Sequence, residues 1–260
     1  MSSIAPVEAL MTIDIGNTRI GMAVSDADGV HHPRHVNLDQ PDTWHKALEA
    51  TWNATNADQS RGVVLASVVH KQTDRLRRIA EDICGVEPLG VGDDIPLPMP
   101  LDVDNPHEVG VDRVCAAAAA YERVNEACAV ASFGSATTID CVSAKGRFLG
   151  GAILPGFEMA YDALHGKTDA LPRVESGAPK SPFGKCTNDA IVNGVTFGMV
   201  GALREIVERY ASELGGWPHL VITGGGAPLI AGLADFIDDV VPDLCLMGVA
   251  LAYRRAAEAS

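Results

Sequence analysis

The sequence predicts an α/β fold of two lobes, each built on a mixed sheet flanked by helices. β-branched apolar runs alternate with segments of helical spacing, the order expected of an α/β layer. A strand–turn–strand pattern with glycine and hydroxyl residues in the turn occurs near residue 16 and again near residue 135. This internal repeat indicates two related lobes with a ligand site between them, which we assign to residues 1–126 and 127–260.

The composition limits the class of protein. With 260 residues, 47% of them hydrophobic, the chain can bury a large core. Its net charge of −14 repels phosphate backbones and argues against broad nucleic-acid binding. The six cysteines are scattered without a C-x-x-C pair, which argues against a zinc site and fits reduced thiols. No basic residue precedes Arg19 and no apolar run approaches a membrane span, so we expect a soluble cytoplasmic protein.

The first repeat predicts a hairpin at residues 9–24, with strands at 9–13 and 20–24 and a turn at Gly16-Asn17. Asp14 ends the first strand, where its carboxylate could hold a hydrated magnesium ion. Backbone donors of the following glycine, asparagine and threonine could meet phosphate oxygens. An ordinary hairpin whose aspartate caps a turn is the alternative that this motif alone leaves open.

The remainder of the first lobe alternates between strands and helices. Residues 41–52 and 71–84 have helical spacing, residues 62–69 form a β-branched run typical of a buried strand, and residues 86–91 suggest a short strand. We expect residues 31–40 to form a polar loop. Its histidines 31, 32 and 35 suggest a metal site, but no cysteine or carboxylate stands nearby at ligand spacing.

An irregular segment at 96–106 leads into Glu108–Arg113 and an alanine-rich helix. Gly110 to Arg113 therefore lies at a helix start, where backbone donors and the positive end of the dipole face outward. Asp112 is either a functional carboxylate or a charge that complements this dipole.

The second lobe repeats the pattern. Strands at 129–133 and 139–142 flank the turn Gly134–Thr138, and Gly150–Gly156 follows a third strand. Further helices are expected at 157–164, 187–214 and 243–257, and a strand at 220–222 enters the glycine-rich turn at 223–226. Three glycines in the long helix (Gly194, Gly198 and Gly201) indicate close packing on another element.

Four motifs stand in one order: DIGNT at 14–18, EVGVDR at 108–113, GSATTID at 134–140 with GGAILPG at 150–156, and TGGG at 223–226. This order resembles that of type III pantothenate kinase, of the actin-like ATPase superfamily with its ribonuclease H-like fold. The resemblance covers nearly the whole chain. It implies ATP-dependent phosphorylation of pantothenate to 4′-phosphopantothenate, the first step of coenzyme A biosynthesis. It also implies magnesium as a cofactor and a homodimer with its site between subunits.

The resemblance assigns roles to individual residues. Asp112 would be the catalytic base, and Asp14 would also hold magnesium indirectly. Arg113 could pair with the pantothenate carboxylate through two parallel hydrogen bonds. The residues implied to bind ATP are Asp14, Ile15, Gly16, Asn17, Thr18, Arg19, Ile20, Gly21 and Ser135. Those implied to bind pantothenate are Gly110, Val111, Asp112, Arg113 and Thr187, with Val103 at a further substrate-lining position.

Two positions depart from the family pattern. The family has an aspartate that ligates a monovalent cation (K⁺ or NH₄⁺) where this chain has Ser132, and a tyrosine where it has Val103. These changes keep two alternatives open: a non-catalytic regulatory relative of the Bvg accessory factor type, and a kinase of the same fold for another small alcohol. The joint presence of Asp14, Asp112 and Arg113 favours the pantothenate kinase.

Overall fold

The computed structural model describes residues 4–259, which divide into two compact units. The first unit contains the chain up to Arg123 together with the segment from Asp243 onward, and the second contains Val124–Pro242. The sequence-based boundary at 126/127 lies close to the first of these divisions. Its assignment of residues 243–260 to the second lobe differs from the structure, because the last helix packs against strands of the first unit.

The sheet of the first unit has the strand order β3-β2-β1-β4-β5. β1 is antiparallel to β2 and parallel to β4. The strands are β1 (Ala9–Ile15), β2 (Arg19–Asp26), β3 (Gly29–Asn37), β4 (Arg61–Ser67) and β5 (Leu89–Gly90).

The expectation of a polar loop at 31–40 was wrong, because β3 occupies most of it. β3 is an edge strand that pairs only with β2, and its polar side chains remain largely exposed. The pairing register shifts between Met22 and Val24, opposite His32 and Pro33. Such a bulge at a sheet edge accommodates a proline and the positive φ of 53° at His32.

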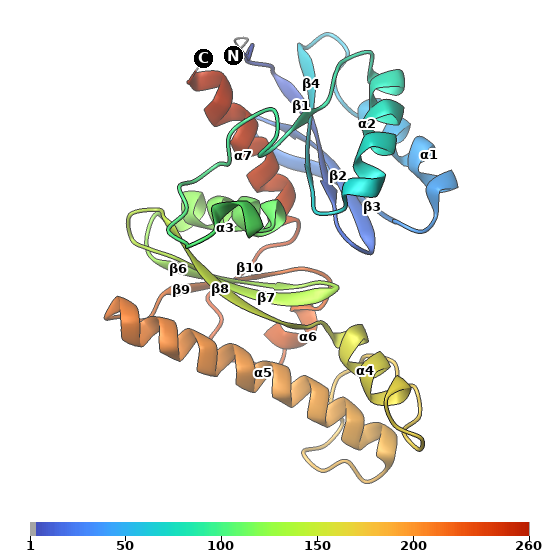
Figure 1. The fold of residues 1–260 in the computed structure, drawn as a ribbon, viewed down its shortest axis with the longest axis vertical. Coiled ribbons are helices and arrows are strands. Elements are labelled where there is room, and N and C mark those ends of the chain that lie inside the picture. The colour runs from blue at the N-terminus through green and yellow to red at the C-terminus, as the bar shows by residue number, and fades with distance from the viewer. Residues whose placement is uncertain (1–3, 260) are drawn as a thin grey trace. The chain divides into compact units, whose positions relative to one another are not determined.

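Helices cover both faces of this sheet (Figure 1). They are α1 (Pro41–Trp52), α2 (His70–Cys84), α3 (Val111–Val124) and α7 (Leu244–Glu258), with a 3₁₀ turn η1 at Pro106–Glu108. The odd-numbered residues Met11, Ile13 and Ile15 of β1 pack with α1 and α2. Leu10 packs instead with α3 and α7. Because side chains alternate along a strand, Asp14 lies on the α3 and α7 side.

The sheet of the second unit has the order β10-β9-β6-β7-β8. Its strands are β6 (Cys128–Phe133), β7 (Ala136–Val142), β8 (Phe148–Pro155), β9 (His219–Thr223) and β10 (Asp239–Val240). Residues 150–155, expected to follow a strand, lie within β8. Gly151 is opposite Asp140 of β7, and a Cβ atom at Gly151 would overlap the Asp140 carboxylate and the β7 backbone.

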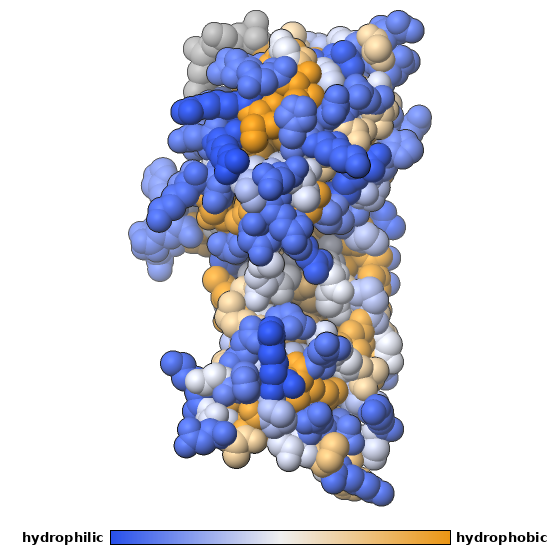
Figure 2. All heavy atoms as spheres, turned by 90° about the vertical axis from the view of Figure 1, so that its right-hand side faces the viewer, coloured by the Kyte–Doolittle hydropathy of each residue, from blue (hydrophilic) through white to orange (hydrophobic). Residues whose placement is uncertain are grey.

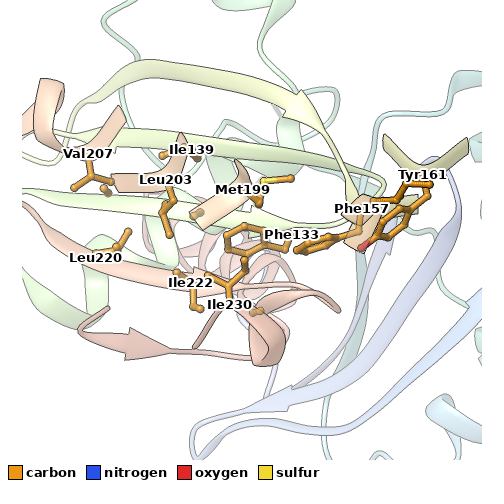
Figure 3. Packing of buried hydrophobic residues seen from close by; sticks show 14 residues of the cluster. Phe133, Ile139, Phe157, Tyr161, Met199, Leu203, Val207, Leu220, Ile222 and Ile230 are labelled. Carbon is orange, nitrogen blue, oxygen red and sulfur yellow. The ribbon is translucent and has the colours of Figure 1, made fainter. Parts of the chain in front are cut away.

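Three helices belong to this unit: α4 (Phe157–Gly166), α5 (Thr187–Leu214) and α6 (Ala227–Ala231). The core between the helices and the sheet is aromatic and aliphatic (Figure 3), and includes Phe133, Phe157, Tyr161, Met199 and Leu203. The Phe133 and Phe157 ring centroids are 6.4 Å apart.

The glycines of α5 do not pack closely on another element, contrary to the sequence-based expectation. A Cβ atom at Gly194, Gly198 or Gly201 would meet no described atom within 4 Å. α5 is long and apolar enough, by length and composition, to cross a membrane. Its apolar stripe (with Leu203 and Val207 fully buried) packs on the sheet, so we interpret α5 as a core helix with one open face.

The face of the protein drawn in Figure 2 is mainly hydrophilic. On the face drawn in Figure 2, apolar residues form separate patches between charged and polar ones. Among the described residues, the exposed large hydrophobic side chains all lie in the second unit. They are Leu149, Ile153, Met159, Phe183, Phe197, Trp217, Leu233 and Val240.

Candidate active site

The segment Asp14–Gly21 forms the end of β1, a tight turn and the start of β2. The Gly16 N–H donates a hydrogen bond of 2.9 Å to the Arg19 carbonyl oxygen, which closes the turn. The side chains of Ile15 and Ile20 are fully buried in the core with α1 and α2. These two isoleucines can therefore offer a ligand only their backbone groups, whereas Asp14 faces the opposite side of the sheet.

Asp14 is a buried carboxylate with an unusual acidity. Burial, and next the charge of Asp112, raise its pKa from the ordinary 3.8 to about 7. A hydrogen bond from the Cys245 thiol lowers the pKa in part. The Asp14 Oδ1 atom has no hydrogen-bond partner among the described residues. A buried carboxylate oxygen left unpartnered in this way fits a role in holding a hydrated magnesium ion.

The N-terminal turns of α3 and α7 meet beside Asp14. Gly248 of α7 lies so close to the Cys115 carbonyl of α3 that a Cβ atom there would overlap it. Asp112 is one turn before Cys115, and Cys245 is one turn before Gly248. A hydrogen bond with Cys115, and then burial, raise the pKa of Cys245, so this thiol stays protonated. Two positive helix ends therefore converge where Asp14 and Asp112 lie.

Asp112 occupies the first turn of α3. Its Oδ1 accepts a hydrogen bond of 2.9 Å from the Arg113 N–H. A Cβ atom at Gly110 would lie 2.6 Å from this oxygen, so the glycine leaves room for the carboxylate. Burial raises the pKa of Asp112, partly offset by the hydrogen bond and the charge of Arg113. A half-buried carboxylate of raised pKa at a helix start is suited to accept a proton.

The other residues implied by the resemblance fall in both units. Val103, Gly110, Val111 and Arg113 accompany Asp14 and Asp112 in the first. The remaining three belong to the second unit, at the end of β6 (Ser132), in the β6–β7 turn (Ser135) and at the first residue of α5 (Thr187).

The residue paired with Ser132 on the neighbouring strand does not carry a carboxylate. It is paired with Thr138 of β7, whereas Asp140 lies two residues further along β7. One Asp140 carboxylate oxygen lies against Gly151 of β8, on the side of β7 away from Ser132. These residues do not fit the family's cation ligand set, because the neutral Ser132 hydroxyl cannot balance an ion's charge.

The three histidines of β3 do not converge on one site. His31 Nε2 lies 3.0 Å from Asp26 Oδ1, and His35 Nε2 lies 2.9 Å from Asp243 Oδ1. Among residues 4–259, no three histidine, cysteine or acidic side chains are grouped so that they could hold a metal ion directly. Sequence reasoning missed His35, Asp243 and Cys245 as neighbours of Asp14.

Comparisons with known proteins show which family the chain belongs to. Residues 10–209 match the family model for type III pantothenate kinase. The chain is 38% identical over 251 residues to the type III pantothenate kinase of Anaeromyxobacter sp. (strain K), covering 95% of this chain and 99% of that protein. The chain belongs to the type III pantothenate kinase family. The protein of that name from Geobacter sulfurreducens is 35% identical over 254 residues, covering 96% and 100% of the two chains.

Solved structures support the fold. A conserved putative Baf family transcriptional activator from Campylobacter jejuni aligns with a TM-score of 0.61 at 19% identity, covering 95% of this chain and 99% of that one. An archaeal actin homologue aligns with a TM-score of 0.50 at 14% identity, covering 97% and 100%. These likenesses show the actin-like ATPase fold that the sequence predicted.

Family membership gives the activity: ATP-dependent phosphorylation of pantothenate, in coenzyme A biosynthesis. The non-catalytic alternative is not favoured, because relatives named as kinases match along 95% of the chain.

Proposed function

We propose that Asp112 is the base that accepts the proton of the pantothenate primary hydroxyl, and that Asp14 positions the magnesium–ATP complex. The observation that carries this assignment is the convergence of both carboxylates at two helix N-termini in the first unit. Backbone groups of Asp14–Gly21, together with Ser135, would bind ATP. Gly110–Arg113, Val103 and Thr187 would bind pantothenate.

Phosphoryl transfer requires the protein mainly to position the reacting groups. The transferred phosphoryl group passes through a loose transition state, so the protein mainly orients groups and neutralises charge. Burial keeps the Asp112 carboxylate more basic than an exposed one, which suits a late proton transfer. The N-terminal ends of α3 and α7 would favour negative charge at the site. Magnesium, held through water by Asp14, would neutralise charge on the phosphates.

In this proposal Arg113 and Val103 contact the pantothenate molecule. The Arg113 guanidinium can bind a carboxylate through two parallel hydrogen bonds. Val103 would offer pantothenate an apolar contact in place of the family's hydroxyl-bearing ring.

A coupled ATPase assay, with and without pantothenate, tests the assignment. ADP should form only when pantothenate is present, with 4′-phosphopantothenate as the second product by mass spectrometry. Other small alcohols that carry a terminal carboxylate are tested in place of pantothenate as phosphoryl acceptors. ATP turnover that another alcohol stimulates more strongly than pantothenate would refute pantothenate as the substrate.

We infer that catalysis does not depend on a monovalent cation, because Ser132 lacks the carboxylate and Asp140 lies against Gly151 instead. The wild-type rate should change little when potassium or ammonium replaces sodium at fixed ionic strength. Ser132→Asp should create a potassium dependence of roughly tenfold, the rate change that corresponds to about 1.4 kcal/mol. Ser212→Asp, at an exposed serine near the end of α5, is the matched control. Strong potassium activation of the wild type would contradict the inference.

We infer a soluble, cytoplasmic homodimer that binds neither nucleic acid nor membrane. The net charge of −14 supports the exclusion of nucleic acid. The open face of α5 supports the dimer: its three glycines have no described neighbour at a Cβ position, and Phe197 beside them is 41% exposed. An apolar groove of about 610 Å³ between α4 and α5, lined in part by Thr187 and Gly194, adjoins this face. Small residues allow helices of two copies to approach closely.

Phe197→Glu should convert the dimer to a monomer, because it places a charge in the middle of this apolar face. Light scattering at several protein concentrations gives the mass. Trp217→Glu, at a similarly exposed (45%) aromatic residue of the same unit, should leave the mass unchanged. A wild-type protein that is monomeric at every concentration would refute the proposed dimer.

A further inference from the structure

A row of three residues crosses the sheet of the first unit beside the phosphate turn. Asp14 of β1 is paired with Gly21 of β2, and Gly21 is paired with His35 of β3. Residues paired across neighbouring strands lie on the same face of a sheet, so all three belong to the face of α3 and α7. β1, β2 and β3 can be followed side by side in Figure 1.

The imidazole of His35 lies over Gly21. A Cβ atom at Gly21 would be 3.3 Å from His35 Nδ1 and 3.4 Å from Cε1. The ring therefore extends from the edge strand across β2, in the direction of Asp14, through space that a side chain at position 21 would narrow. About half of the side chain (49%) remains exposed, so a ligand can reach it.

Asp243 fixes the opposite side of the ring. Its Oδ1 lies 2.9 Å from His35 Nε2, which must then carry a hydrogen. Asp243 precedes α7 with φ 54° and ψ 29°, a left-handed conformation that is uncommon for a non-glycine residue. Strained residues of this kind persist where the surrounding structure holds them, often at functional sites.

The charges around this ring are mixed. Asp14 faces it from β1, Asp243 from the position just before α7, and Arg19 from β2. A hydrogen bond to Asp243 raises the pKa of His35, burial opposes this, and the charges of Asp243 and Asp14 raise it further while Arg19 lowers it. The net direction is upward, so the protonated form, in which both nitrogens donate, persists to higher pH than in a free imidazole.

We propose that His35 is a further nucleotide-binding residue, which Asp243 orients so that its Nδ1–H, over Gly21, donates to a phosphate oxygen of ATP at the β1–β2 turn. The proposal rests on the ATP site proposed above. In an acidic protein an anionic nucleotide needs local donors, and a histidine held by an aspartate supplies one with a positive charge.

The test is calorimetric titration with a non-hydrolysable ATP analogue and magnesium. His35→Gln should weaken binding by about tenfold, the loss of one charge-assisted hydrogen bond, with the KM for pantothenate unchanged. His31→Gln is the matched control: His31 is on the same strand and pairs with Asp26 at 3.0 Å, but is opposite Val24, away from the turn. It should bind the analogue as the wild type does. The difference between wild type and His35→Gln should shrink as pH rises through the raised pKa of His35, because the wild-type ring loses its proton.

Asp243→Asn, which retains His35, gives a second measurement should His35→Gln unfold; it should also weaken analogue binding. Unchanged analogue affinity in a folded His35→Gln or in Asp243→Asn, or an equal loss of pantothenate affinity, would overturn the proposal. Such a result would leave the pair as a structural link between β3 and α7. Failure of the ATP site itself is distinguishable, because then the wild type would not bind the analogue, or Asp14→Asn would bind it equally well.

Discussion

Replacing Asp112 with asparagine is expected to lower kcat by roughly two to four orders of magnitude, the usual loss for a general base. The asparagine side chain has nearly the same size and can still accept the hydrogen bond that the Arg113 N–H donates to Asp112 at 2.9 Å. The fold and the affinity for ATP should therefore be nearly unchanged. The variant removes only the proposed proton acceptor and its charge, in a site where burial raises the pKa of the carboxyl group.

Initial rates at saturating ATP and pantothenate measure this effect, and thermal unfolding verifies the fold. Glu108→Gln is the matched control, because Glu108 is an exposed acid of the same motif and should tolerate the change. Wild-type kcat should rise with pH through the raised pKa of Asp112, since only the ionised form accepts a proton. A near wild-type rate for Asp112→Asn would reduce Asp112 to a charge that complements the α3 dipole.

Most of the secondary structure could be predicted from the sequence, because its signals are local. The hairpin at Gly16 and the alanine-rich helix α3 follow from turn chemistry and helix propensity. β3 was missed because its stability comes from pairing with β2, and its own residues, including Pro33, have little strand preference. The place of α7 was missed for a similar reason, since packing between segments far apart in sequence leaves no local pattern.

The residues of the candidate site differ in the same way: some could be predicted from the local sequence, and others could not. Asp14 and Asp112 could be found because each ends or begins an element within a recognisable motif. His35, Asp243 and Cys245 come near Asp14 only through the register of β3 and the position of α7. His35 was expected in a loop, and Asp243 precedes a helix. Nothing in the local sequence therefore indicates that their side chains pair.

The glycines of this chain differ in how closely they pack, and the sequence does not indicate which ones pack closely. Gly194, Gly198 and Gly201 suggested tight packing, yet each has open space around its Cβ position. Gly248 gave no expectation of close packing, yet it permits the contact between α3 and α7 that brings Asp112 and Cys245 beside Asp14. Composition alone does not distinguish these cases, because the neighbour that decides them comes from elsewhere in the fold.

Replacing Asp14 with asparagine is expected to raise the free energy of unfolding while weakening magnesium–nucleotide binding. The Asp14 carboxyl is buried, with a pKa of about 7 against an ordinary value of 3.8. The folded state therefore resists its ionisation, and the wild type loses stability as pH rises from about 4 to about 7. Above that range the loss approaches about 4 kcal/mol, an upper bound obtained from the size of the shift. The neutral asparagine avoids this loss but cannot hold the cation's charge.

Denaturant unfolding of both proteins across this pH range measures the stability, and calorimetry with the ATP analogue measures binding. The two proteins should be nearly equal in stability at pH below 3.8 and diverge above it, with the variant more stable. Asp26→Asn, at the other end of β2, provides a control of opposite sign. Although slight burial raises the pKa of Asp26, hydrogen bonds from the Asp28 N–H and from His31 lower it overall, so its ionised form stabilises the fold. If Asp14→Asn were less stable than the wild type at pH 8 and still bound magnesium–nucleotide normally, Asp14 would be a structural residue of the hairpin.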